Sequence, residues 1–149
     1  MLREGPMGQV IEKVIVQNLE DIFLFKRGEC EKGSIRTIKM EAIVDTGASL
    51  LCLLPSAIRQ LGLHDSKSRC VRTANSVVER RIFKGANIII RDRDMSMSVM
   101  ESDETTPALI GCLVLEALDF VVDPVAKKLL PNPDHNGEWM TDVFLSQTR

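Results

Sequence analysis

The sequence has no closely paired cysteines and little histidine. The four cysteines and two histidines are widely spaced and form no Cys-x-x-Cys motif: Cys30, Cys52, Cys70, Cys112, His64 and His135. Because structural zinc sites use closely spaced cysteines and histidines, we expect no metal and no cofactor. The thiols are interpreted as small buried groups and the histidines as surface residues. Cys52 has no histidine nearby in the sequence to activate it, so a cysteine protease is excluded.

Long apolar runs and strong net charge are also missing. No stretch approaches the ~18 apolar residues of a membrane span, and residues 1–8 lack the apolar core of a leader, so we expect a cytoplasmic protein without membrane association. A net charge of -2 gives no electrostatic footprint for nucleic acid. One basic cluster is interpreted as a solvated face, with a groove for acidic ligands as the alternative: Arg69, Arg72, Arg80, Arg81 and Lys84.

Phosphate-binding motifs are absent as well. No glycine-rich nucleotide loop occurs, and Asp45 lacks the second aspartate two positions later that a haloacid-dehalogenase-type nucleophile needs. Phosphate chemistry is therefore not expected.

Short segments rich in β-branched and apolar residues fill most of the chain and predict a small all-β barrel or sandwich. Hairpins are expected at residues 74–76, where Asn75 tolerates a positive φ, and at residues 91–94. Residues 131–137 are interpreted as a linker, and residues 139–145 as either a C-terminal strand or a tail. The expected strands are residues 10–16, 22–25, 40–44, 50–54, 70–73, 77–83, 88–90, 95–100, 120–122 and 128–130, and the expected helices are residues 56–61 and 113–117.

The motif with chemical content is Asp45-Thr46-Gly47, which follows apolar residues 40–44. An isolated triplet of this kind is usually a turn, because aspartate caps backbone amides and glycine adopts unusual dihedral angles. Here it continues into Ala48, Ser49 and a second apolar segment, and a Leu-Ile-Gly element follows at residues 109–111.

This ordered set resembles the retropepsin-like aspartic proteases, specifically the small bacterial single-domain members, over residues 18–133. Asp45 matches the catalytic aspartate, and Thr46, Gly47, Ala48 and Ser49 match the active-site loop. Ile110 and Gly111 match the element that supports this loop from behind. The flap position is taken by Thr73, Ala74, Asn75 and Ser76, where relatives more often have Ala-Asp-Gly, and the absence of tyrosine excludes a pepsin-type flap tyrosine.

The resemblance implies a closed barrel of short strands with a flap hairpin and one or two short helices. Its expected limits are an N-terminal segment at residues 1–9, a protease domain at residues 10–131 and a C-terminal tail at residues 132–149.

One triplet per chain implies a homodimer, since peptide hydrolysis by this route needs both a carboxylate base and a carboxylic acid. Two carboxylates ~3 Å apart at an effective dielectric of ~20 repel by ~5 kcal/mol when both are ionised, so they share one proton. Two copies of Asp45 across a two-fold axis supply such a pair. The expected function is a homodimeric aspartic endopeptidase acting on peptide or protein substrates.

Two alternatives stay open. A catalytically silent dimerisation or peptide-binding module could retain the fold, and the flap without glycine keeps this reading open. A small β-protein in which Asp45 only caps a turn would leave the Leu-Ile-Gly element as a coincidence.

Overall fold

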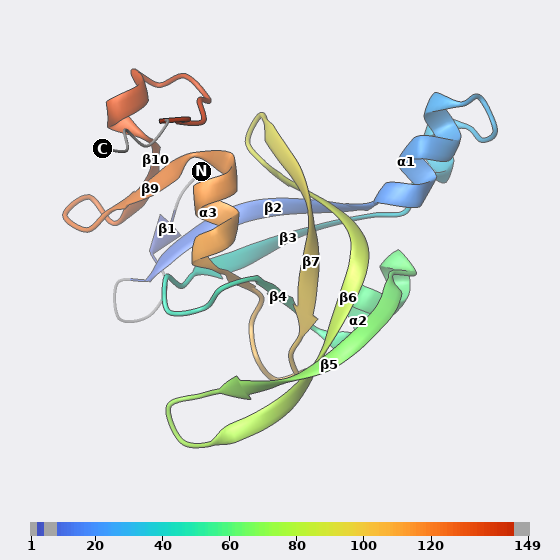
Figure 1. Cartoon of the computed structure of the whole chain (residues 1–149), viewed down its shortest axis with the longest axis horizontal. Coiled ribbons are helices and arrows are strands. Elements are labelled where there is room, and N and C mark those ends of the chain that lie inside the picture. Colours follow the sequence, from blue (N-terminus) through green and yellow to red (C-terminus); the bar gives the residue numbers. More distant parts are fainter. Residues whose placement is uncertain (1–2, 5–8, 145–149) are drawn as a thin grey trace, which may run out of the picture.

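The structure is a computed structural model that describes residues 3–4 and 9–144. Its strands are β1 (Arg3–Glu4), β2 (Val10–Asn18), β3 (Thr37–Val44), β4 (Leu51–Leu53), β5 (His64–Arg72), β6 (Val77–Ile90), β7 (Arg93–Glu101), β8 (Leu109–Ile110), β9 (Phe120–Asp123) and β10 (Lys128–Pro131). Eight of them form one sheet in the order β1-β2-β3-β8-β4-β7-β6-β5, and β9 pairs with β10. An additional pairing of β2 with β6 closes the large sheet into a ring (Figure 1). The prediction of an all-β barrel is confirmed.

Helices occupy the margins of this barrel: α1 (Leu19–Lys26), α2 (Pro55–Leu61), α3 (Cys112–Leu118), and the 3-10 turns η2 (Lys32–Ser34) and η3 (Pro133–His135). The two predicted helices are confirmed as α2 and α3. The strand expected at residues 22–25 is wrong, because this segment belongs to α1. The Asn18 side chain accepts a hydrogen bond from the Asp21 amide, and Glu20 and Asp21 lie in the first turn, where acidic groups complement the helix dipole.

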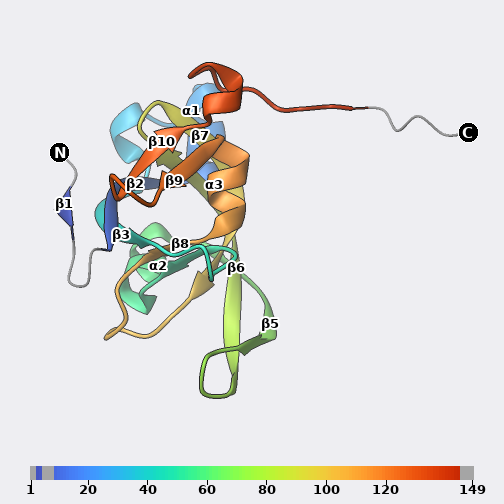
Figure 2. The same cartoon turned by 90° about the vertical axis from the view of Figure 1, so that its left-hand side faces the viewer.

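Two expected strands, residues 77–83 and 88–90, are parts of the single long strand β6. Gly85 joins them with a φ of +94°, at an irregularity in the pairing with β7. A left-handed residue of this kind is tolerated because glycine has no Cβ. The outer half of β6 pairs with β5, and together they form a hairpin that projects from the barrel (Figure 2).

The core lies inside the barrel and under α2. Alternate residues of β2 point inward, and its Val14 and Val16 are fully buried. All three residues of β4 are buried, as predicted for a strand covered on both faces. Burying an aliphatic side chain contributes about 1.5–3 kcal/mol, so these residues stabilise the strands next to Asp45.

The segment expected to be a linker instead packs against the domain. Residues 133–135 form η3, and His135, interpreted from sequence as a surface residue, is buried. Residues 139–144 form no strand in this single chain, and residue 145 lies outside the described residues. Within residues 3–4 and 9–144, no helix is long and apolar enough to cross a membrane.

Candidate active site

The loop that carries Asp45 is tied to the strand behind it through the backbone. β3 runs parallel to β8, and the Asp45 amide donates a hydrogen bond to the Ile110 carbonyl at 2.9 Å. On the far side of the loop, the Cys112 amide donates to the Ala48 carbonyl at 2.8 Å. Both ends of the loop are therefore fixed by β8 and the start of α3.

Gly111 allows this close contact. A Cβ atom built on it would lie 2.4 Å from the carbonyl carbon of Ser49 and 2.5 Å from the carbonyl oxygen of Leu50. The backbone at Gly111 is extended, with φ -86°, so glycine is needed for space and not for its dihedral angle. Any side chain here would push the loop away from β8.

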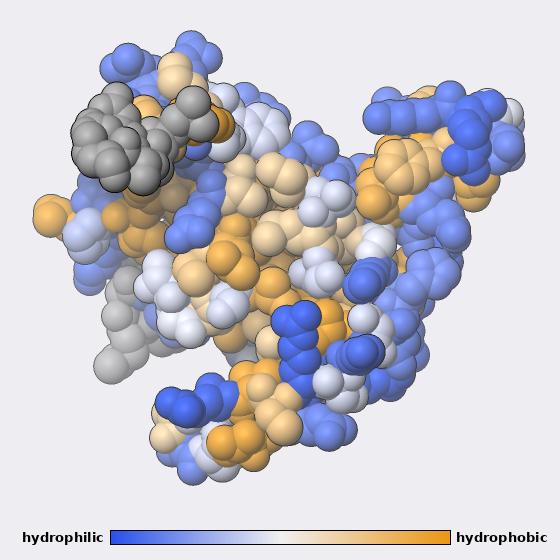
Figure 3. Space-filling view, in the orientation of Figure 1, coloured by the Kyte–Doolittle hydropathy of each residue, from blue (hydrophilic) through white to orange (hydrophobic). Residues whose placement is uncertain are grey.

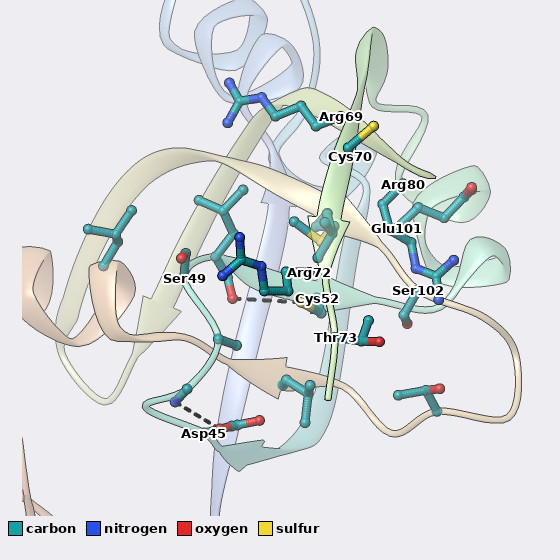
Figure 4. A pocket seen from close by; sticks show the side chains of 18 of the residues that line it. Asp45, Ser49, Cys52, Arg69, Cys70, Arg72, Thr73, Arg80, Glu101 and Ser102 are labelled. Atoms are coloured by element: carbon teal, nitrogen blue, oxygen red, sulfur yellow. Dashed lines mark hydrogen bonds between the residues drawn. The ribbon is translucent and has the colours of Figure 1, made fainter. Parts of the chain in front are cut away.

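The Asp45 carboxylate is half-buried at the end of β3. The Gly47 amide donates a hydrogen bond to its Oδ1 atom at 2.9 Å (Figure 4). Its Oδ2 atom receives no hydrogen bond from the residues that the structure describes. Thr46 and Gly47 are exposed beside it. The carboxylate is thus oriented through one oxygen while the other remains available.

A cleft of about 820 Å³ separates this loop from the β5–β6 hairpin. Asp45, Gly47, Ala48 and Ser49 line one side, and the space-filling view shows the molecule hollowed between the hairpin and the barrel (Figure 3). Residues 69–74 line the other side. The hairpin therefore occupies the position expected of a flap.

The flap turn is built without any left-handed residue. The Thr73 hydroxyl accepts a hydrogen bond from the Ser76 amide at 3.1 Å and donates one to the Ser76 carbonyl at 2.9 Å. Neither Ala74 nor Asn75 has a positive φ, so the expectation that Asn75 would adopt one is wrong. Of the four predicted flap residues, Thr73 and Ala74 line the cleft, whereas Asn75 and Ser76 do not.

Cys52 also lines the cleft, but it is poorly suited to act as a nucleophile. Burial raises the pKa of its thiol, and the negative charge of Asp45 raises it further, although Arg80 has the opposite effect. The thiol therefore stays protonated near neutral pH. All four cysteines are unpaired. The expectation that they are buried holds for Cys52 but is wrong for Cys70, which is exposed. No cluster able to hold a metal ion occurs among the described residues.

Sequence reasoning placed the basic cluster on a solvated face, and the structure divides it. Arg69, Arg72 and Arg80 line the cleft, whereas Arg81 pairs with Asp65. The strand register decides this division, because neighbouring residues of a strand point to opposite faces. Arg69 and Arg80 lie equally far from the flap turn in the sequence, but this spacing indicates a pair only once the strand register is known.

A second polar cluster lies at the C-terminal end of α3, around the buried His135. Its Nδ1 atom is 2.6 Å from Asp119 Oδ2, and its Nε2 atom is 3.0 Å from Asp142 Oδ1. The hydrogen bonds to Asp119 and Asp142 raise the pKa of His135. Burial opposes ionisation of Asp119, but hydrogen bonds from His135, the Met140 amide and Asn132 hold its pKa below the usual range. These groups fasten the C-terminal segment to the domain.

Comparisons with known proteins agree with this geometry. Residues 32–117 match a family model described as gag-polyprotein putative aspartyl protease. Among solved structures, the chain is similar to a retropepsin-like aspartic protease from Rickettsia conorii, with 18% identity, 82% of each chain covered and a TM-score of 0.54. No curated protein matches the sequence. Since the family model spans more than half of the chain, this protein belongs to the gag-polyprotein aspartyl protease family, and its fold is retropepsin-like.

Proposed function

We propose that the protein is a homodimeric aspartic endopeptidase in which Asp45 of each copy supplies half of the catalytic pair. The observation that carries this proposal is the Asp45 loop, which Gly111 allows to pack against β8 while Thr46 and Gly47 stay exposed. A carboxylate held this firmly at the open edge of a cleft fits a site that a second copy completes. Among the described residues, the carboxylates that line the cleft are those of Asp45 and Glu101, and of these two only Asp45 lies on the exposed loop.

Hydrolysis in the proposed dimer requires the two Asp45 carboxyls to share one proton. The ionised carboxylate removes a proton from water as the water oxygen bonds to the peptide carbonyl carbon, while the protonated carboxyl donates a hydrogen bond to the carbonyl oxygen. The carbon–nitrogen bond then breaks as a carboxyl transfers its proton to the leaving nitrogen. One water is consumed, and the pair returns to its singly protonated form.

The remaining site residues position this chemistry. The Gly47 amide fixes one Asp45 oxygen, and Thr46 orients the loop by hydrogen bonding across the axis. Ala48 and Ser49 form the cleft wall, with Ile110 and Gly111 as the support behind them. The flap holds an extended peptide against the loop, because pairing with a strand satisfies the backbone groups of the peptide. Residues 10–131 form the protease domain in this proposal, flanked by residues 1–9 and by a tail at residues 132–149.

The unpaired state of all four cysteines fits a reducing compartment, and we extend the proposal to a cytoplasmic location. The principal rival is a silent peptide-binding module with the same fold. Its main support was the flap without glycine, but the turn at residues 74–75 takes no left-handed residue. The flap composition therefore does not count against turnover.

Cleavage of a peptide library by the wild type and by Asp45→Asn tests the proposal. The asparagine keeps an oxygen that can accept the Gly47 hydrogen bond but cannot act as a base, so we expect turnover to fall by at least about 10³-fold. Mass spectrometry of the products at mildly acidic and neutral pH measures it, and unchanged thermal unfolding controls for the fold. Equal cleavage by both proteins would assign the activity to a contaminant. Binding without cleavage by the wild type would favour the silent module.

A further inference from the structure

Two arginines occupy paired positions on the two strands of the flap, and their side chains extend toward different parts of the cleft (Figure 4). In the pairing of β5 with β6, Arg69 lies directly opposite Arg80, and both line the cleft. Directly opposed residues of an antiparallel pair project from the same face, and like charges in this arrangement destabilise the pair. Arg80 is half-buried, which limits the water that screens its charge. The flap thus places two like charges at paired positions on the surface that covers the cleft.

Neither of these arginines, nor the nearby Arg72, has a carboxylate partner within the described part of the chain. Arg80 donates only a long hydrogen bond, of 3.4 Å, to the neighbouring Glu79 carbonyl. The other arginines with described side chains have partners. Arg93 donates hydrogen bonds to three backbone carbonyls. The remaining five pair with carboxylates: Arg27, Arg36, Arg59, Arg81 and Arg91. Among the arginines with described side chains, the three that neither pair with a carboxylate nor donate to several backbone carbonyls are those that line the cleft.

The charges along the cleft are unequal. Three arginines line it, against the carboxylates of Asp45 and Glu101. In a dimer whose two Asp45 groups share one proton, the excess of positive charge becomes larger. Figure 4 shows Asp45 at the lower end of the cleft, Arg72 near the middle and Arg69 at the upper end, so the positive groups extend along it. A peptide in this cleft would pass beside them.

We propose that Arg69 and Arg80, together with Arg72, form a subsite for acidic side chains, so that the substrates are peptides with glutamate or aspartate near the cleaved bond. This inference rests on the proposed function. A guanidinium binds a carboxylate through two parallel hydrogen bonds, and these three arginines offer such donors at separate points along the cleft. Since the two-fold axis places one such subsite on each side of the cleaved bond, the acidic preference occurs on both sides.

A binding experiment separates this inference from catalysis. The probes are fluorescent ten-residue peptides of one sequence, with glutamate or glutamine placed in turn at each position, titrated into Asp45→Asn. Glutamine matches glutamate in shape and lacks its charge. We expect the best glutamate peptide to bind about fivefold more tightly than its glutamine counterpart at low salt. This advantage should shrink as ionic strength rises, because salt screens exposed charges.

Variants of the flap locate the effect. Arg69→Gln and Arg80→Gln, each in the Asp45→Asn background, should bring the two affinities together. Arg81→Gln is the matched control, since Arg81 lies on the same strand, pairs with Asp65 and does not line the cleft, and it should keep the preference. Equal affinity for glutamate and glutamine peptides, or a preference that survives both flap variants, would overturn the inference.

Cleavage assays with the same peptides and the wild type distinguish the two proposals. Cleavage without an acidic preference would support the proposed protease activity and contradict the proposed subsite. Preferential binding of glutamate peptides without cleavage would support the proposed subsite and contradict the proposed protease activity. Faster cleavage of the glutamate peptides, by about fivefold at low substrate concentration, is the result that both proposals predict.

Discussion

The two sides of the cleft are stabilised in different ways. The Asp45 loop is held by backbone hydrogen bonds to residues 110–113, and a missing Cβ atom at Gly111 lets the two segments touch. The flap projects from the barrel, and its turn is held by hydrogen bonds between Thr73 and Ser76. The outer half of β5 carries mostly exposed side chains, in contrast to the buried β4 beneath the cleft.

This contrast separates two requirements of a protease. Proton transfer needs the carboxylates at a fixed place, which a backbone-anchored loop provides. Selection of a peptide needs a surface that can adjust and that carries the discriminating groups, which suits an exposed hairpin lined with arginines. Changes in the loop should therefore abolish activity and lower stability together, whereas changes in the flap should alter substrate binding with little effect on stability.

The largest effect is expected for Gly111→Ala. The new methyl group would overlap the backbone of Ser49 and Leu50, so we expect the free energy of unfolding to fall by about 3 kcal/mol and cleavage to be lost. Denaturant unfolding and peptide cleavage measure the two effects.

Gly33→Ala is the matched control for this change. A Cβ atom at Gly33 would meet nothing within 4 Å, so its stability should stay within about 0.5 kcal/mol of the wild type. Equal effects of the two substitutions would remove the distinction between a tightly packed loop and the rest of the chain.

A smaller effect is expected for Thr73→Val, which keeps the shape of the side chain and removes its hydroxyl. The flap turn would lose the hydrogen bonds to Ser76, each contributing about 1 kcal/mol, and we expect KM to rise about fivefold with kcat nearly unchanged. Ser76→Ala serves as the control, since the Ser76 hydroxyl makes no hydrogen bond to the described residues. A large loss of overall stability in Thr73→Val would show that the flap is not independent of the barrel.

The smallest effect on cleavage is expected for His135→Gln. His135 does not line the cleft, so this variant is a reference for changes that affect neither the Asp45 loop nor the flap. Asp119 and Asp142 raise the pKa of His135 in the folded protein. The protonated His135 therefore stabilises the fold fully at pH values below the unfolded pKa of about 6.5. This stabilisation is lost as the pH rises through the higher pKa of the folded state. The pKa of Asp119 is lowered, so that group stays ionised throughout. Thermal unfolding of both proteins from about pH 5 to about pH 9 should show Tm values that converge at high pH. A difference independent of pH would assign the effect to packing.

Much of the barrel was predictable, because alternating and fully apolar strands leave clear signatures. The buried β4 and the helix α2, which begins at Pro55 and ends at Gly62, are examples. The strand expected at residues 22–25 was wrong because its apolar residues were weighed without the Asn18 cap and the acidic first turn of α1. His135 was misplaced because its partners, Asp119 and Asp142, become neighbours only in the fold.

Some residues of the candidate site were predictable from the sequence, and others were not. Asp45, Gly47 and Gly111 belong to short motifs whose spacing reflects their contacts, so the sequence was sufficient to nominate them. Arg69 and Arg80 are eleven positions apart and become a pair only through the register of the flap strands. The sequence alone allowed two interpretations of the basic cluster, a groove for acidic ligands and a solvated face, and it did not decide between them.

The central claim is that the active species contains one Asp45 from each of two copies, and mixing tests it directly. Wild type and Asp45→Asn are combined at equal amounts, allowed to exchange subunits, and compared with wild type at the same total concentration. If each dimer needs both aspartates, random pairing leaves about a quarter of the dimers active, and the cleavage rate should fall to about a quarter. A rate of about one half would mean that each wild-type chain works on its own and would contradict the shared site.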